Sequence, residues 1–254
     1  MTATEPSRSI AGFAIFSLVM VIGLTSLGAW QLQRRVAKHA LIAALDERLS
    51  KAPVPLPPAS EWNSLAPVRE EFRRVTFTAT YARLPDAMVY SSGSAVRTDV
   101  SGPGTWAFLP ARLAGGETVA VEAGFVPNTM QDRAQQDRAV SRLVTGESVT
   151  LTGYIRFPET AGQLTPGEDK AKRLWFVRDP PAMARALGWA DNGKPFAPFY
   201  IDLEQPVPES GIPKPGPLVV HLKDDHLQYA ITWFTLAAAV ALAFAVWLRA
   251  QRSS

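Results

Sequence analysis

The chain has 254 residues, no cysteine, and 26 Lys and Arg against 23 Asp and Glu, a formal net charge of +3. The absence of cysteine excludes disulfides, thiolate metal sites, iron–sulfur clusters and a cysteine nucleophile. The basic residues are scattered along the chain and form no basic stripe, so nucleic acid is not an expected partner.

The first predicted element is a long helix. Residues 10–32 carry no charge, and a helix of that length spans the roughly 30 Å hydrocarbon layer of a membrane. The stretch is longer than the apolar part of a signal peptide and runs into polar helical sequence, so we expect an uncleaved anchor. Apolar residues from Val36 to Leu49 predict that the helix continues to about Ser50, where the Pro-rich residues 53–58 end it.

Strands follow, each a β-branched or aromatic run bounded by Gly, Pro or Asp; they are expected at residues 76–81, 87–90, 105–113, 118–126, 148–157 and 199–203. Adjacent glycines in residues 114–117 predict a hairpin that joins two of these runs as an antiparallel pair. The polar residues 128–143 fit an exposed helix and an insertion between strands equally well. Residues 180–187 predict a short helix, capped by Asp179 and stopped by Gly188.

Residues 227–248 form a second uncharged stretch of spanning length. The predicted fold class is therefore a membrane protein of the α+β type, with two transmembrane helices flanking a mainly antiparallel β domain with short helices. Its expected parts are an N-terminus at residues 1–9, a first span at 10–32, the β domain at 33–226, a second span at 227–248 and a tail at 249–254. The nine residues before the first span are too short and too acidic for a mitochondrial transit peptide, which favours a bacterial inner membrane.

The charges beside the spans do not agree on the orientation. Arg249 and Arg252 place both termini in the cytoplasm by the positive-inside rule, which puts the β domain outside. Three basic residues after the first span, from Arg34 to Lys38, outnumber Arg8 before it and favour the opposite orientation. These charges leave both orientations open.

His226 begins the second span and is followed at helical spacing by Tyr229 and Trp233, which we expect on its face. The outer end of the first span carries Trp30, Gln31 and Arg34, which two antiparallel spans would bring to the same membrane level. Histidine is a common axial ligand of haem iron, arginine pairs with propionates, and aromatic rings suit a porphyrin face. The competing interpretation is structural, because Trp and Tyr favour membrane interfaces and arginines at helix ends extend to the headgroups.

Other candidate sites have simple structural interpretations. A metal site at His221, Asp224, Asp225 and His226 competes with a capping box, in which Asp225 and Gln228 start the second helix. The chain has no Gly-x-Ser-x-Gly, His-Glu-x-x-His, P-loop or dinucleotide motif, so no enzyme class is indicated. We interpret Glu168 and Asp169 as residues of a loop, and Asp179 of the Arg178-Asp179 pair as a helix cap.

Four stretches, in this order, resemble the surfeit locus protein 1 family. They are Leu27-Gly28-Ala29-Trp30-Gln31-Leu32-Gln33-Arg34, Trp175-Phe176-Val177-Arg178-Asp179-Pro180, Ala197-Pro198-Phe199-Tyr200-Ile201-Asp202 and His226-Leu227-Gln228-Tyr229-Ala230-Ile231-Thr232-Trp233-Phe234. The resemblance covers most of the chain. Two positions depart from the family pattern, Lys223-Asp224-Asp225 before the histidine and Glu168-Asp169 in mid-chain.

The resemblance implies a non-enzymatic assembly factor, or chaperone, for haem–copper cytochrome c oxidase, with its β domain in the periplasm or intermembrane space. It implies that His226 is the axial ligand of a transiently held haem a, with Tyr229, Trp233, Trp30, Gln31 and Arg34 as expected supporting residues. The implied partners are the oxidase catalytic subunit and membrane lipid, with haem a synthase as a further candidate. The alternative is a membrane-tethered scaffold that holds an oxidase assembly intermediate without a cofactor.

Overall fold

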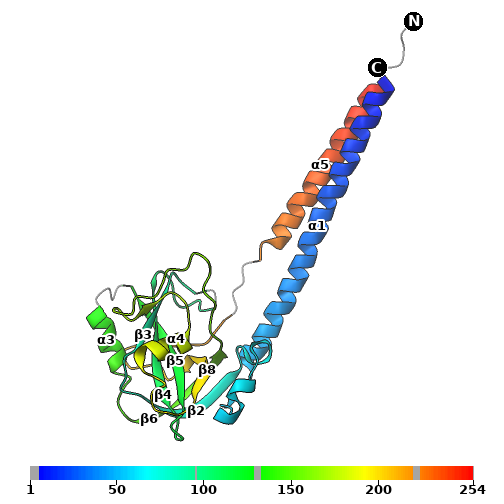
Figure 1. Cartoon of the computed structure of the whole chain (residues 1–254). Coiled ribbons are helices and arrows are strands. Elements are labelled where there is room, and N and C mark those ends of the chain that lie inside the picture. Colours follow the sequence, from blue (N-terminus) through cyan, green and yellow to red (C-terminus); the bar gives the residue numbers. More distant parts are fainter. Residues whose placement is uncertain (1–5, 95, 129–132, 220–223, 254) are drawn as a thin grey trace. The chain divides into compact units, whose positions relative to one another are not determined.

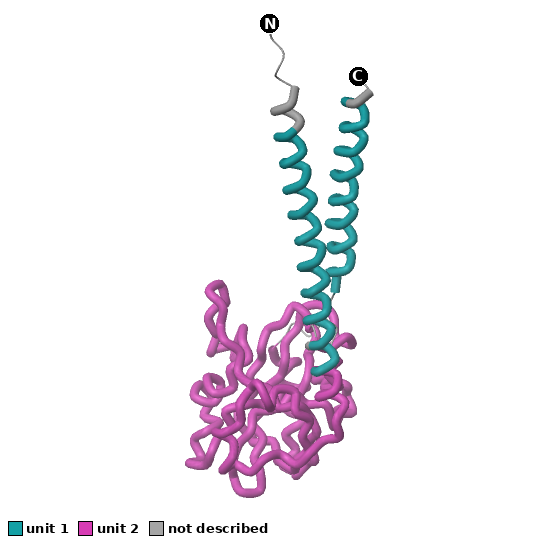
Figure 2. The backbone as a smooth tube through the Cα atoms, turned by 90° about the vertical axis from the view of Figure 1, so that its right-hand side faces the viewer, with its two compact units in different colours: residues 1–44, 222–254 teal, residues 45–221 magenta. Residues whose placement is uncertain are grey.

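A computed structural model describes residues 6–94, 96–128, 133–219 and 224–253. The chain forms two compact units, coloured separately in Figure 2. Unit 1 consists of residues 1–44 and 222–254, and unit 2 of residues 45–221. The first helix belongs mostly to unit 1, and its last turns belong to unit 2.

Unit 1 is a pair of long helices, α1 (Pro6–Ser50) and α5 (His226–Ser253), which run antiparallel and side by side (Figure 1). Phe13 near the start of α1 packs edge-on against Trp247 near the end of α5, with 4.7 Å between ring centroids. Both helices are long and apolar enough to cross a membrane, and most of their apolar surface is exposed. This composition suggests membrane anchoring, since the central helix of a soluble domain is mostly buried.

Partly or fully buried positions recur every three or four residues along both helices of unit 1. This is the spacing at which two helices pack along one continuous seam. The seam positions of α1 are Ser17, Val21, Leu24, Gly28, Gln31, Arg35 and Lys38, and those of α5 are His226, Ala230, Trp233, Ala237, Val240, Phe244 and Trp247. Small residues in the middle of the seam allow the two backbones to approach closely.

Unit 2 is built on one eight-stranded sheet with the order β1-β2-β6-β8-β5-β4-β3-β7. The strands are β1 (Val54–Pro55), β2 (Arg74–Tyr81), β3 (Ala87–Ser91), β4 (Gly104–Arg112), β5 (Thr118–Pro127), β6 (Ser148–Arg156), β7 (Leu174–Trp175) and β8 (Phe196–Gln205). A further pairing of β2 with β4, at Thr80–Arg112 and Tyr81–Ala111, closes β2, β6, β8, β5 and β4 into a ring. The ring is a small barrel, which leaves fewer free strand edges than an open sheet.

Alternate residues of the barrel strands face a common apolar interior, as the two-residue period of a strand requires. Val75, Phe77 and Ala79 of β2 and Val119, Val121 and Ala123 of β5 belong to this core. The residues between them face outward. On β4, β5 and β8 those outward residues form a second apolar cluster with Met183 and Ala184 of helix α4 (Pro180–Leu187).

The sequence predicted the longer elements of unit 2 to within a few residues. The expected hairpin is present, with the Gly116 N–H donating to the Leu113 carbonyl and with Gly116 at φ 90°. Helix α4 has the predicted bounds, and the Asp179 carboxylate accepts from the Ala182 N–H at 3.0 Å as its N-cap. Of the polar residues 128–143, residues 133–141 form helix α3 (Arg133–Ser141), and residues 129–132 lie outside the described part.

Several short elements were not predicted. The two-residue strands β1 and β7 pair in parallel with β2 and β3, and the 3₁₀ helix η1 (Ala59–Ser64) and helix α2 (Pro67–Glu70) lie between β1 and β2. Strand β5 also pairs in parallel with β8, so the sheet is mixed, but most of its pairings are antiparallel, as expected.

Candidate functional site

The candidate site in unit 1 centres on a contact between its two helices. His226, the first residue of α5, lies with its Nδ1 2.8 Å from Oε1 of Gln31 on α1. An amide oxygen only accepts hydrogen bonds, so with Gln31 Oε1 as the partner it is the Nδ1–H tautomer of the neutral ring that makes this bond. The lone pair is then on Nε2, the ring nitrogen that remains for an electrophile or a metal ion.

A second contact holds the start of α5 against α1 through Asp224. One carboxylate oxygen of Asp224 lies 2.6 Å from His39 Nε2 and 3.6 Å from Arg35 Nε, while the other accepts from the His226 N–H at 3.1 Å. Partial desolvation raises the pKa of Asp224, but the hydrogen bonds from His39 and from the His226 N–H outweigh it and lower the pKa overall. Asp224 is therefore an anion that ties the helix start to α1.

Arg35 and His39 were not among the predicted site residues. Gln31, Arg35 and His39 are spaced by four residues, so they occupy one face of α1. That spacing was visible in the sequence, but only the pairing of α1 with α5 shows that this face meets Asp224 and His226.

The other predicted site residues divide into two groups. Trp233 is partly buried and lies on the seam with His226. Trp30 and Tyr229 are 51% and 54% exposed. Arg34 is exposed and places its guanidinium 5.9 Å from the Trp30 ring on the same helix. The structure therefore brings Gln31 to His226 and Arg34 to Trp30, while Trp30 and Tyr229 lie outside the seam.

These residues suit a haem group better than a bare metal ion. One imidazole with a fixed tautomer supplies a single axial ligand, and exposed aromatic rings and a nearby arginine suit a porphyrin and its propionates. Within the described residues, no three His, Asp or Glu side chains are grouped as metal ligands. His221, which we considered as a ligand, lies outside them.

In unit 2, the two mid-chain motifs meet on the outer face of the barrel. Arg178 donates from Nε to Glu122 Oε2 at 2.8 Å and from Nη1 to Glu159 Oε1 at 3.1 Å. Glu122 on β5 is the register partner of Asp202 on β8, which accepts from Arg156 Nη1 at 3.4 Å. Burial raises the pKa of Asp202 to about 7, and the Glu122 carboxylate acts in the same direction, while the arginines oppose it.

The other conspicuous carboxylates have structural roles. Asp179 caps α4, as predicted. Asp169 accepts from the Lys172 N–H and forms an ion pair with the Lys172 side chain, and Glu168 pairs with Lys170. The contacts of Glu168 and Asp169 are those of a folded loop, and Asp179 is a helix cap, which agrees with both interpretations.

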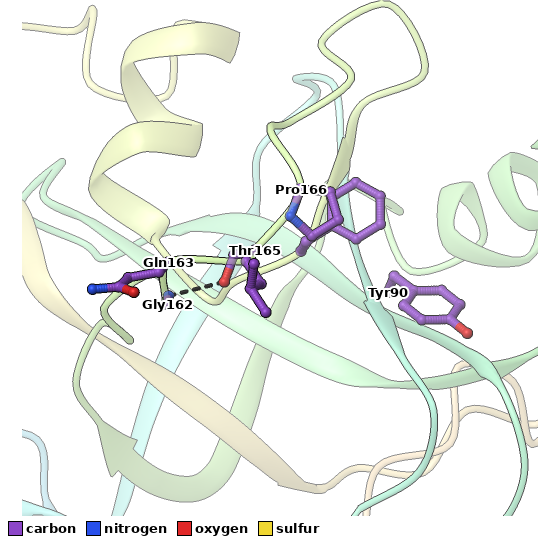
Figure 3. Close-up of a pocket in the computed structure, with 7 residues that line it drawn as sticks. Tyr90, Gly162, Gln163, Thr165 and Pro166 are labelled. Atoms are coloured by element: carbon purple, nitrogen blue, oxygen red, sulfur yellow. Dashed lines mark hydrogen bonds between the residues drawn. The ribbon is translucent and has the colours of Figure 1, made fainter.

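A wide apolar recess of about 760 Å³ lies elsewhere on unit 2 (Figure 3). Tyr90 and Phe176 line it with 6.1 Å between ring centroids, and a turn closed by the Gly162 N–H to Thr165 Oγ1 hydrogen bond forms another part. Leu164 on this turn is 97% exposed. None of the predicted site residues lines this recess.

The fold and the site define a class of protein: a small β-barrel domain within a chain that begins and ends in apolar helices of membrane-spanning length. The model of the SURF1 family matches residues 18–238. Surfeit locus protein 1 of Rattus norvegicus is 31% identical over 251 residues, which cover 96% of this chain and 76% of the relative. The chain belongs to the SURF1 family.

Other relatives are similar to this chain over nearly all of its length. Surfeit locus protein 1 of Homo sapiens is 30% identical over 237 residues, covering 88% of this chain and 73% of the relative. A SURF1-like protein of Drosophila melanogaster is 30% identical over 262 residues, covering 97% of this chain and 80% of the relative. The matches extend over both helices and the β domain, so the likeness concerns the whole arrangement of elements.

Proposed function

We propose that this chain is an assembly factor for haem–copper cytochrome c oxidase that holds haem a transiently through His226. Membership of the SURF1 family supports the role in oxidase assembly. The observation that carries the haem part is the 2.8 Å contact between His226 Nδ1 and Gln31 Oε1, which leaves Nε2 as the ligating atom. Histidines that ligate metals generally donate the other ring N–H to a carbonyl or carboxylate, as His226 does here.

Each nearby residue has a role in this proposal. Gln31 fixes the tautomer and the ring orientation of His226, and Asp224 fixes the helix end that carries the histidine. The exposed rings of Trp30 and Tyr229 offer apolar surface to the porphyrin, with Trp233 beside His226 on the seam. Arg34 offers a charge to a propionate. Binding by one axial histidine suits a carrier, because the haem must leave again for the oxidase catalytic subunit.

The haem proposal is tested by co-expressing the full chain with haem a synthase and recording the absorption spectrum of the purified protein. We expect a haem a spectrum that His226→Ala removes or strongly weakens. His39→Ala is the matched control, because it removes another histidine of unit 1 but not the proposed ligand; since it also removes a contact of Asp224, it should weaken haem a binding less than His226→Ala does. An unchanged haem stoichiometry in His226→Ala contradicts the proposed ligand.

We further propose that the two helices span a bacterial inner membrane, in contact with its lipids, and that the β domain lies in the periplasm. The expected partners are the oxidase catalytic subunit and haem a synthase as the donor of haem a. A topology reporter inserted near Gly146 should then report the periplasm, and a second one after Ser254 should report the cytoplasm. A cytoplasmic signal at Gly146 refutes this orientation.

The alternative is a scaffold that holds an oxidase assembly intermediate and binds no haem. The exposed apolar recess around Tyr90 and Leu164 favours it, since such surfaces often contact other proteins. The scaffold predicts that oxidase subunits co-purify with the chain in cells that make no haem a. Association that requires haem a synthesis and His226 supports the carrier instead.

A further inference from the structure

The outer face of the barrel holds a second polar site, formed by residues to which the proposed haem role gives no part. It is a recess of about 220 Å³ whose charged lining consists of Arg97, Arg156, Arg178, Glu122, Glu159 and Asp202. These residues come from β5, β6, β8 and the loops around them. Three arginines and three carboxylates balance when all six are ionised, and protonation of Asp202, whose pKa is about 7, leaves one positive charge in excess.

Most of these charges already have protein partners. Arg178 is held by Glu122 and Glu159, and Arg156 donates from Nε to Glu71 at 2.7 Å as well as to Asp202. Burying ions is costly unless they are paired, so this network accounts for the presence of the carboxylates in the recess. The carboxylates therefore do not require a bound cation.

The unsatisfied groups at the recess are all hydrogen-bond donors. Arg97 holds Asp99 with Nε and Nη2 at 2.8 and 2.9 Å, which lowers the pKa of Asp99 well below its usual range. Its third nitrogen, Nη1, is buried and has no partner among the described residues, and the same is true of Nε1 of Trp106. Both side chains line the recess, and each residue is only 1% exposed.

A third donor lies beside the same charges. The Tyr200 hydroxyl is buried without a partner among the described residues, and burial raises its pKa well above the ordinary value, so it keeps its proton. A buried donor without an acceptor costs about 1 to 3 kcal/mol, and native proteins leave few of them. Tyr200 is not among the residues that line the recess, so the two unpartnered donors in the lining, Arg97 and Trp106, are the groups that point to a missing acceptor.

We propose that this recess binds a small organic carboxylate, whose oxygens accept from Arg97 Nη1–H and Trp106 Nε1–H. Guanidinium and indole N–H groups are donors only, so the ligand must supply acceptors. With Asp202 protonated the lining carries one positive charge, which favours a singly charged ligand over a doubly charged phosphate. A volume of about 220 Å³ exceeds that of one water molecule several times, so a group of a few heavy atoms fits.

The test titrates acetate into the full chain in a neutral detergent, in a buffer free of other carboxylates and of phosphate. Isothermal calorimetry should give saturable binding, and acetate should raise the unfolding temperature. Trp106→Phe removes the donor and retains the aromatic ring, which lies 5.8 and 5.3 Å from the guanidinium carbons of Arg97 and Arg178. It should weaken acetate binding by about 10- to 100-fold, the usual loss for a hydrogen bond to a charged group, without lowering the unfolding temperature of the acetate-free protein.

Trp62→Phe is the matched control. Trp62 is equally buried, but its Nε1 donates to the Pro57 carbonyl at 2.8 Å, so this variant should lose stability and retain acetate affinity. Arg97→Lys keeps the positive charge near Asp99 but lacks the Nη1 donor. It should therefore lower acetate affinity as Trp106→Phe does. His226→Ala should leave acetate affinity unchanged, which separates this site from the haem proposal.

Three results overturn the proposal. One is the absence of saturable acetate binding to the unaltered chain, which means that water alone satisfies the donors. Another is equal acetate affinity in the unaltered chain, Trp106→Phe and Arg97→Lys. The third is equal stabilisation by chloride or inorganic phosphate at matched ionic strength, which indicates a general salt effect.

Discussion

Gly28 offers a direct test of the close approach between α1 and α5, and we predict that Gly28→Ala weakens it. A Cβ at this position would lie 2.7 Å from Cε1 and Cζ of Phe234 and 2.9 Å from its Cδ1. Carbon atoms in contact prefer about 3.5 to 4.0 Å, so the ring or the helix must move by about 1 Å. Gly28 lies one turn before Gln31, and the displacement should lengthen the hydrogen bond between Gln31 and His226.

The change that Gly28→Ala makes to the free energy of helix pairing is the sum of two opposing effects. Overpacking a closely packed contact costs about 1 to 3 kcal/mol, whereas replacing glycine by alanine inside a helix gains about 1 kcal/mol. The net loss is then about 0 to 2 kcal/mol, up to about 30-fold in the equilibrium between paired and separated helices. At Gly23 on the same helix an added Cβ meets nothing within 4 Å, so Gly23→Ala should be neutral or stabilising.

The assay is the unfolding temperature of the full chain in detergent, with haem a retention measured on the same samples. Gly28→Ala should lower both relative to Gly23→Ala. Adding Phe234→Leu to Gly28→Ala should restore both, because the smaller side chain leaves room for the new methyl group. If Gly28→Ala and Gly23→Ala behave alike, or if Phe234→Leu has no restoring effect, the close contact at Gly28 does not hold the pair together.

Two further predictions concern single side chains. Gln31→Leu removes the acceptor for His226 Nδ1–H. Loss of such a partner usually lowers metal affinity about 10- to 100-fold, so a lower concentration of imidazole should remove haem a from this variant than from the unaltered chain. Equal resistance to imidazole contradicts the orienting role of Gln31. Asp202 has a pKa of about 7 in the folded protein against 3.8 ordinarily, so above pH 4 the unfolded chain binds fewer protons at this group and stability falls as pH rises towards 7. Relative to the unaltered chain, Asp202→Asn has no proton to lose and should therefore gain stability between pH 5 and pH 8, by about 3 kcal/mol, because the pKa difference acts over about two pH units of that range. Unfolding curves that shift equally with pH in both proteins refute this.

The two candidate sites illustrate different uses of polar groups in one chain. The contact of His226 with Gln31 leaves a lone pair, which suits a ligand that supplies an electrophilic metal. The recess near Trp106 leaves donors, which suits a ligand that supplies acceptors. The acetate and haem experiments can therefore succeed or fail independently.

The sequence by itself determined the features that depend on neighbouring residues. The helix that runs from the first apolar stretch to Ser50, the hairpin at Gly116 and the capped helix α4 all follow from local periodicity and from turn or capping residues. His226 was also found in this way, because it begins an apolar helix and lies in a recognisable motif. Its role as a haem ligand remains a prediction.

Only the tertiary structure decided the features that join distant segments. Closure of the barrel by β2 and β4, and the parallel pairing of β5 with β8, depend on contacts between strands that no local pattern encodes. The predicted residues Gln31 and His226 proved to be partners, and His39 and Asp224 joined them, because two helices separated by the whole β domain pack along one seam. Local chemistry therefore determined which segments become helices or strands, while the recess near Trp106 and the surroundings of His226 depended on which of those segments pack together.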